Sequence, residues 1–85
     1  MSLIELREEV NEIDNKIMKL IVRRFDIALD IGKYKIKNKL LIEDKKREEE
    51  IINSRINSSK LSENFVRELF NLIFEESKHI QRKVK

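Results

Sequence analysis

Several polar side chains occupy positions where the spacing of the sequence calls for apolar ones. In the first half of the chain, apolar residues recur in steps of three and four, but Arg24 fills the slot between Leu20 and Ile27. Two other segments extend an apolar row with polar residues at steps of four: Ser77 and Gln81 follow Ile73, and Glu48 precedes Ile52. Polar groups in line with the packing faces of three segments predict an internal, polar-lined pocket between helices.

The spacing along one helix decides which of these groups can reach the same ligand. Lys35 lies three turns from Arg24 on nearly the same face, about 16 Å away along a helix axis, so both long side chains can reach a small ligand between them. Arg7 lies about 25 Å from Arg24 in the other direction and can reach that ligand only from a second subunit. Taken alone, Arg24 fits a core ion pair or a coiled-coil register device as well as it fits a ligand site. Arg7 and Lys35, each taken alone, fit a solvated surface.

Three predicted helices must position these groups. The apolar pattern and the predicted N-caps Asp44 and Ser62 give helices over about residues 3–38, 44–56 and 62–83. Residues 39–43 lose the pattern and form a connection. The first helix would be roughly 50 Å long, too long to fold back on itself in so small a domain. It therefore needs a partner from another chain.

Composition supports a single all-α domain over residues 1–85. The chain has no proline, one glycine and 40% hydrophobic residues, and good helix formers such as leucine, lysine and glutamate are abundant. A helical monomer of 85 residues can bury only a thin core, so the apolar stripe of the long helix predicts a homodimer.

The same composition argues against several classes of protein. Without cysteine there is no disulfide or thiol chemistry, and a single histidine, His79, makes a structural zinc site improbable. The net charge of +3 comes from 19 basic and 16 acidic residues interspersed along the chain, so nucleic acid is not an expected partner. No run approaches the roughly 20 apolar residues of a membrane span, and the chain opens without a secretion signal. We therefore expect a cytoplasmic protein that binds neither a metal nor a membrane.

Six groups of residues, taken in order, carry a family resemblance. They are Leu6-Arg7-Glu8, Ile13-Asp14, Arg24, Gly32-Lys33-Tyr34-Lys35, Asp44-x-x-Arg47-Glu48 and Ser77-x-x-x-Gln81. Each group alone means little in a chain that is 41% charged. The ordered set, which runs from about Leu3 to Gln81, resembles the all-helical class of chorismate mutases.

The resemblance implies an intertwined homodimer that has antiparallel long helices and two identical sites. Each site would rearrange chorismate to prephenate, a step in phenylalanine and tyrosine biosynthesis. Arg24 and Arg7 of the partner subunit would bind the two carboxylates, and Lys35 and Gln81 would act on the ether oxygen. The other implied contacts are Glu48 and the Asp44 backbone at the ring hydroxyl, with Arg47 and Ser77 completing the pocket. Such a rearrangement needs no cofactor, nucleophile, proton shuttle or metal, so catalysis would rest on Arg24, Lys35 and Gln81.

Two other functions stay open at the level of sequence. An isochorismate-pyruvate lyase resembles the mutases in scaffold and uses a similarly charged pocket. A non-catalytic helical interaction module or small nucleic-acid binder would use basic residues near Lys39 and Arg82, although neither region has interleaved aromatic residues. The sequence ends soon after Gln81, so we expect a free-standing module. The segment before Asp44 lacks the proline of many relatives, which leaves the conformation of residues 39–43 open.

Overall fold

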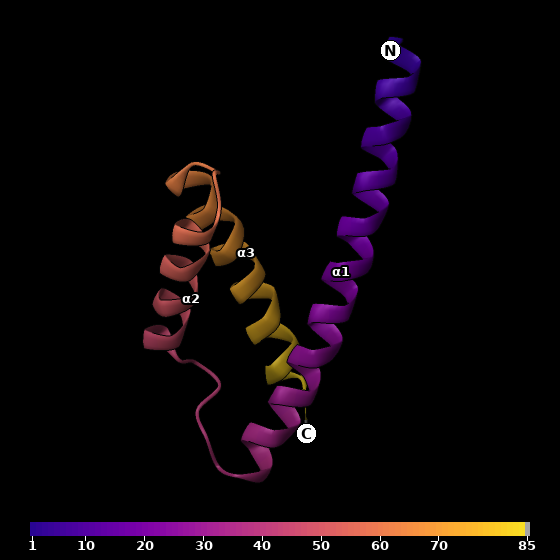
Figure 1. Cartoon of the computed structure of the whole chain (residues 1–85). Coiled ribbons are helices and arrows are strands. Elements are labelled where there is room, and N and C mark those ends of the chain that lie inside the picture. The colour runs from indigo at the N-terminus through magenta and orange to yellow at the C-terminus, as the bar shows by residue number, and fades with distance from the viewer. Residues whose placement is uncertain (85) are drawn as a thin grey trace.

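The computed structural model describes residues 1–84 and contains three helices over that range (Figure 1). Helix α1 spans Leu3–Lys37, α2 spans Lys45–Ser58 and α3 spans Glu63–Arg82. Each helix end lies within two residues of the position expected from the sequence. No strand occurs in the described part of the chain, and the prediction of an all-α fold is confirmed.

Helices α2 and α3 begin at polar residues that cap their first turns. The Asp44 carboxylate accepts a hydrogen bond from the backbone N–H of Arg47 at 3.0 Å. The Ser62 hydroxyl accepts one from the backbone N–H of Phe65 at 3.2 Å. Each cap satisfies a backbone donor that has no partner inside the helix, so both predicted N-caps are confirmed.

Helix α1 ends in a left-handed turn at Lys39, whose φ is 57°. The backbone N–H of Lys39 bonds to the Ile36 carbonyl at 3.2 Å, and that of Leu40 bonds to the Lys35 carbonyl at 2.8 Å. This pair of bonds is the Schellman pattern that usually has glycine at the left-handed position. The turn ends α1 and starts the connection that leads to α2 (Figure 1).

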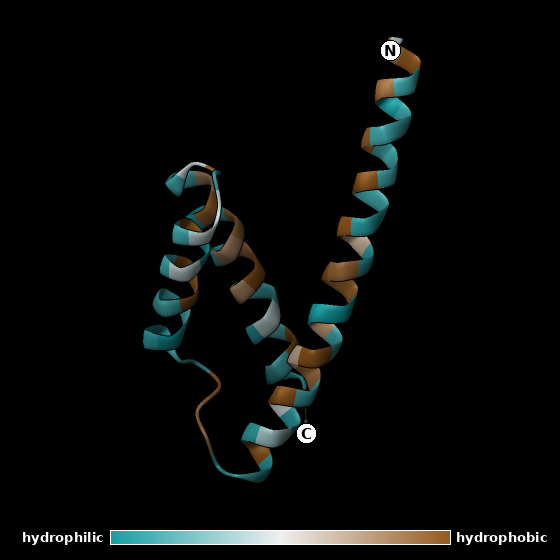
Figure 2. Ribbon diagram, in the orientation of Figure 1, coloured by the Kyte–Doolittle hydropathy of each residue, from teal (hydrophilic) through white to brown (hydrophobic). Residues whose placement is uncertain are grey.

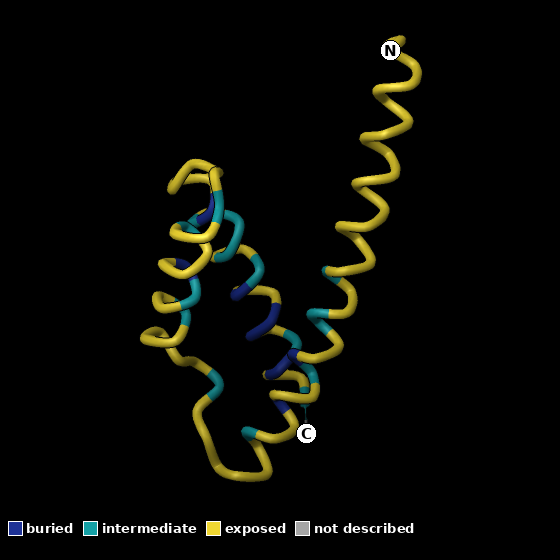
Figure 3. Tube along the Cα trace, viewed as in Figure 1, coloured by how far each residue is buried: buried dark blue, intermediate teal, exposed yellow. Residues whose placement is uncertain are grey.

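Helix α3 lies between the other two helices (Figure 1). It packs against the C-terminal half of α1 and against α2, whereas α1 and α2 make no helix-to-helix contact within residues 1–84. The described chain measures 55 × 26 × 15 Å, because the N-terminal half of α1, residues 3–20, projects beyond the other helices. Every residue of this half is exposed, as Figure 3 shows.

The core is small and lies along α3. Its buried apolar side chains are Ala28, Ile52, Val66 and Phe74. The rings of Phe70 and Phe74 pack at 6.0 Å between centroids. At Gly32 of α1, an added Cβ atom would lie 3.0 Å from Cα, Cβ and Cγ of Gln81. The missing side chain of Gly32 thus lets α3 bring Gln81 close against α1.

The best-buried row of α3 lies one position away from the row that we singled out in the sequence. That row, which ends with Ile73, Ser77 and Gln81, starts at Phe65 when it is followed back in steps of four. The Phe65 side chain is 51% exposed, and the row becomes buried only at Ser77 and Gln81. A row at steps of four drifts by about 40° per step around a helix with 3.6 residues per turn, so it crosses from one face to the next. The row that carries most of the core consists of Val66, Phe70, Phe74 and Lys78.

Helix α1 leaves an apolar stripe uncovered along its whole length (Figure 2). Each residue of the stripe is at least 43% exposed: Leu3, Leu6, Val10, Ile13, Ile17, Leu20, Ile27, Ile31 and Tyr34. Within residues 1–84, the packing of α3 against the C-terminal half of α1 leaves these side chains partly exposed. None of the helices in the described residues has the length and apolar character needed to cross a membrane.

Candidate active site

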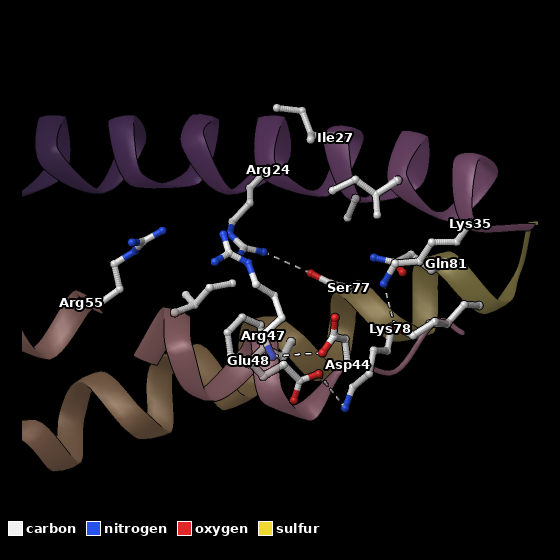
Figure 4. Close-up of a pocket in the computed structure, with 15 residues that line it drawn as sticks. Arg24, Ile27, Lys35, Asp44, Arg47, Glu48, Arg55, Ser77, Lys78 and Gln81 are labelled. Atoms are coloured by element: carbon white, nitrogen blue, oxygen red, sulfur yellow. Dashed lines mark hydrogen bonds and ion pairs between the residues drawn. The ribbon is translucent and has the colours of Figure 1, made fainter. Parts of the chain in front are cut away.

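A cleft of about 440 Å³ opens between α1 and α2, with α3 as its floor (Figure 4). It brings together all the site residues that the sequence predicts within one chain: Arg24, Lys35, Asp44, Arg47, Glu48, Ser77 and Gln81. These residues come from all three helices and from the N-cap of α2. The prediction of a polar-lined pocket between helices is confirmed, and the size of the cleft suits a small molecule.

Arg24 reaches from α1 across the cleft to α3. Its Nη1 atom donates a hydrogen bond to the Ser77 hydroxyl at 3.3 Å, and its guanidinium carbon lies 5.8 Å from the centre of the Phe74 ring. Burial, and then the positive charge of Arg55, lower the pKa of Arg24. Within the described chain Arg24 forms no ion pair with a carboxylate, so the core ion pair considered above is absent there. A half-buried guanidinium without an acidic partner suits an anionic ligand.

Lys35 and Gln81 lie near each other at one end of the cleft (Figure 4). The Lys35 ammonium donates to the backbone carbonyl of Ile42 at 2.9 Å, which ties the connection to α1 and leaves two of its three donors free for a ligand. Gln81 is only 7% exposed, and its Oε1 atom is buried without a hydrogen-bond partner among residues 1–84. Buried amides are normally satisfied, and an amide can present either its donor or its acceptor to a ligand.

The start of α2 supplies the other wall of the cleft. One carboxylate oxygen of Asp44 accepts the hydrogen bond of the N-cap described above. The Nη1 atom of Arg47 lies 3.6 Å from the Oε2 atom of Glu50, and the Arg47 side chain is 64% exposed. Glu48 is the more buried acid, and its Oε2 atom lies 3.3 Å from the ammonium of Lys78. A ligand in the cleft would therefore meet a carboxylate that is already paired with a lysine.

Two charged residues of the cleft escaped the sequence analysis. Lys78 is buried at 8% exposure, and the sequence signal for it was the row Val66, Phe70, Phe74 and Lys78, in which a charged residue ends an apolar run. Arg55 lines the far end of the cleft and lies 5.8 Å from the centre of the Phe70 ring. No sequence signal marks Arg55, because it stands among polar residues of α2.

Arg7 does not reach the cleft of its own chain. It lies in the projecting half of α1 and is exposed. The helical rise puts Arg7 about 25 Å from Arg24 along the axis. Its contribution from a second subunit stays a prediction.

The charges in the cleft define what it can bind. Five cationic side chains, Arg24, Lys35, Arg47, Arg55 and Lys78, face two carboxylates, Asp44 and Glu48. No cluster of three or more potential metal-ligating side chains occurs in the described residues. Such a cleft attracts a small anion and offers an acceptor to one of its hydroxyls. Fold and site together define a small helical protein with a pocket lined mainly by cationic side chains.

The chain belongs to the chorismate mutase type II family, whose model matches residues 6–82. It is 34% identical to a chorismate mutase of Methanocaldococcus jannaschii over 94% of this chain and 84% of the relative. It is 37% identical to a bifunctional chorismate mutase/prephenate dehydratase of Buchnera aphidicola, matching 98% of this chain but only 22% of that longer protein. The solved structure of a conserved hypothetical protein from Pyrococcus furiosus superposes with a TM-score of 0.79, at 44% identity over 94% of this chain and 95% of that one. The resemblance noted in the sequence is confirmed.

Proposed function

We propose that this chain works as a cytoplasmic homodimeric chorismate mutase that rearranges chorismate to prephenate for phenylalanine and tyrosine biosynthesis. The observation that carries the proposal is the convergence of Arg24, Lys35 and Gln81 on one cleft without acidic partners, in a member of this family. A guanidinium, an ammonium and an amide match a substrate with two carboxylates and an ether oxygen.

Binding would fold the flexible substrate into a reactive shape. Arg24 holds one carboxylate and Arg7 of the partner subunit holds the other, since an arginine fork fits a carboxylate with two parallel bonds. Glu48 and the Asp44 backbone hold the ring hydroxyl. Arg47 and Ser77 complete the pocket. Fixing a single substrate in the compact chair conformation brings the two bond-forming carbons together.

The chemical step needs electrostatic help at one atom. As the carbon–carbon bond forms and the carbon–oxygen bond breaks, negative charge grows on the ether oxygen, and no proton or electron leaves the substrate. The Lys35 ammonium and the Gln81 amide donate to that oxygen. Because the charge is larger in the transition state than in the substrate, these donors lower the barrier more than they tighten binding.

The dimer would complete each site. The uncovered stripe of α1 offers an apolar surface over its whole length, and burying one leucine or isoleucine stabilises an assembly by about 1.5–3 kcal/mol. Antiparallel pairing of two α1 helices would bring the projecting half of one subunit over the cleft of the other. Arg7 would then lie near Arg24 of the opposite subunit, a distance that it cannot span within its own chain.

The proposal is tested by following ultraviolet absorbance of chorismate with the purified protein. We expect chorismate to disappear and prephenate to form without added cofactor or metal. A parallel assay with isochorismate measures pyruvate release, which would mark a lyase. Pyruvate release without prephenate formation, or no turnover of either compound by the folded dimer, would contradict the proposal.

A further inference from the structure

Lys78 is the one charged side chain of residues 1–84 that the structure classes as buried, and the function proposed above gives it no role. Its side chain is 10% exposed, and its Nζ atom touches three carboxylates. It lies 3.3 Å from Glu48, 3.4 Å from Glu75 and 3.5 Å from Glu43. Cations are rarely buried unless they are paired, so this cluster calls for a physical reason.

The three carboxylates differ in exposure, and the difference singles out Glu48. The side chains of Glu43 and Glu75 are 45% and 72% exposed, so water weakens their pairing with Lys78. Glu48 is 23% exposed, makes the shortest of the three contacts and is the one carboxylate of the cluster that lines the cleft. The contact of Lys78 with Glu48 is therefore the one that bears on the site.

We propose that Lys78 is a positioning residue that holds the Glu48 carboxylate in place to accept a hydrogen bond from the substrate hydroxyl. This inference rests on the proposed function, because it needs Glu48 to accept a hydrogen bond from a ligand in the cleft. The Lys78 Nζ atom is occupied by three carboxylates and contacts the Oε2 atom of Glu48 (Figure 4), while Glu48 keeps free acceptor capacity for a ligand.

Charge on Lys78 is secure over the working range of pH. Burial by itself lowers the pKa of Lys78, but the hydrogen bonds and charges of Glu48 and Glu75 outweigh it and raise that pKa above its usual value. A raised lysine pKa means that the contribution of the charged pair is complete below the ordinary lysine value and is lost only as pH rises through the folded value. The support given to Glu48 is thus constant across neutral pH.

Removing Lys78 would reverse the electrostatics around Glu48. Glu43 from the connection and Glu75 from α3 would remain beside it as like charges. Across the cleft, Arg24 and Lys35 of α1 donate to Ser77 and to the Ile42 carbonyl instead of to Glu48. On α2 itself, Arg47 pairs with Glu50, and Asp44 accepts from the backbone N–H of Arg47. Without its cation, the Glu48 carboxylate would be repelled by the charges of Glu43 and Glu75 and would lose the contact that fixes its position.

The test compares three variants with the wild-type dimer by steady-state kinetics from about pH 5 to 8. Lys78→Met should raise KM about tenfold, with a smaller change in kcat. Lys78→Arg keeps the charge and should restore most of the affinity. The matched control is Arg67→Met, which removes a 3.0 Å ion pair to Glu49 that also links α3 to α2 but lies outside the cleft. The control should leave KM unchanged at every pH.

A further variant shows whether Lys78 acts through Glu48. In a Glu48→Gln background, Lys78→Met should add little to KM, because the carboxylate that Lys78 positions is gone. If circular dichroism shows that Lys78→Met is unfolded, Lys78→Gln replaces it with the same expected rise in KM.

Three results would overturn the inference for Lys78: a Lys78→Met enzyme with the wild-type KM at all pH values, additive effects of the two substitutions, or an equal loss in Arg67→Met. Failure of the proposed function would look different, because the wild-type protein itself would then be inactive on chorismate.

Discussion

The two halves of α1 have the same apolar pattern but opposite surroundings. The C-terminal half, residues 21–37, packs on α3, buries Ala28 and Gly32 and sends Arg24 and Lys35 into the cleft. The N-terminal half, residues 3–20, continues the stripe and carries Arg7, yet every residue there is exposed. One half of the helix is thus positioned by its own chain, and the other half has no neighbouring helix within residues 1–84.

In the proposed reaction, the described part of one chain would supply most of the site but not all of it. The cleft gathers the groups that contact the ether oxygen, the ring hydroxyl and one carboxylate in the proposed reaction. The group for the second carboxylate lies in the half of α1 that has no neighbour. Substitutions in the two halves should therefore have different effects on assembly and on turnover, and the following predictions use that difference.

The largest effect is expected from a charge placed on the stripe of the free half. Ile13→Asp would put an unpaired carboxylate into the apolar interface, which costs several kcal/mol, so the dimer should dissociate and activity should fall by about 1000-fold or more. Light scattering and the chorismate assay measure the two changes. Asn15→Asp adds the same charge off the stripe and should leave a dimer. An Ile13→Asp protein that stayed dimeric would place the interface elsewhere.

In the packed half, Lys35→Ala should spare the dimer and damage the chemical step. Losing one donor to a developing negative charge typically lowers turnover by about 100- to 1000-fold, so kcat should fall steeply while KM changes less. Lys33→Ala removes the same charge two residues away, outside the cleft, and serves as the control. A Lys35→Ala enzyme with a raised KM and normal kcat would mean that Lys35 only binds substrate.

Gln81→Glu should make kcat, which we expect to be independent of pH near neutrality, depend on pH. An amide donates equally well at any pH near neutrality, whereas a carboxyl donates only when protonated and repels the ether oxygen when ionised. We expect kcat to fall by about tenfold or more as pH rises through about 6 to 7, the range of a carboxyl shifted upward by burial. Gln81→Leu, which has no donor at any pH, should be uniformly slow. A level profile for Gln81→Glu between about pH 5 and 8 would place Gln81 outside the reacting centre.

Gly32→Ala is expected to have the smallest effect, and its sign is informative. Alanine stabilises an unobstructed helix by about 1 kcal/mol relative to glycine. Here the new Cβ would lie 3.0 Å from the Cα of Gln81, so α3 must shift, and overpacking typically costs about 1–3 kcal/mol. We expect a lower thermal midpoint and a kcat reduced by about tenfold or less, since Gln81 moves with α3. A more stable Gly32→Ala protein with normal kcat would show that the contact does not hold Gln81 in place.

The local features of the fold could be predicted from the sequence because their signals are local. Asp44 and Ser62 cap helices through their own first turns, and the break in periodicity at Arg24 marks a polar group on a packing face. The positions of the site residues within one chain followed from these helices. Their catalytic roles stay predictions.

Other features depend on contacts that no local pattern encodes. Lys39 has a left-handed conformation that is usually found at glycine, so the residue type gives no signal of the turn. The row that ends at Lys78 places it on a packing face of α3, but its pairing with Glu43 and Glu48 from other segments arises only in the tertiary fold. The row from Phe65 was chosen for its spacing, but which row of α3 is buried depends on where α1 and α2 lie.

The most direct test of the shared site is complementation between Arg7→Ala and Arg24→Ala subunits. Each homodimer should be inactive, because every site lacks one arginine. After the two proteins are unfolded and refolded together, half of the dimers are mixed and each mixed dimer has one site with both arginines, so about a quarter of wild-type activity should return. If mixed dimers form, as shown by a tag on one subunit, and no activity returns, Arg7 does not act across the interface and the account of the site is wrong.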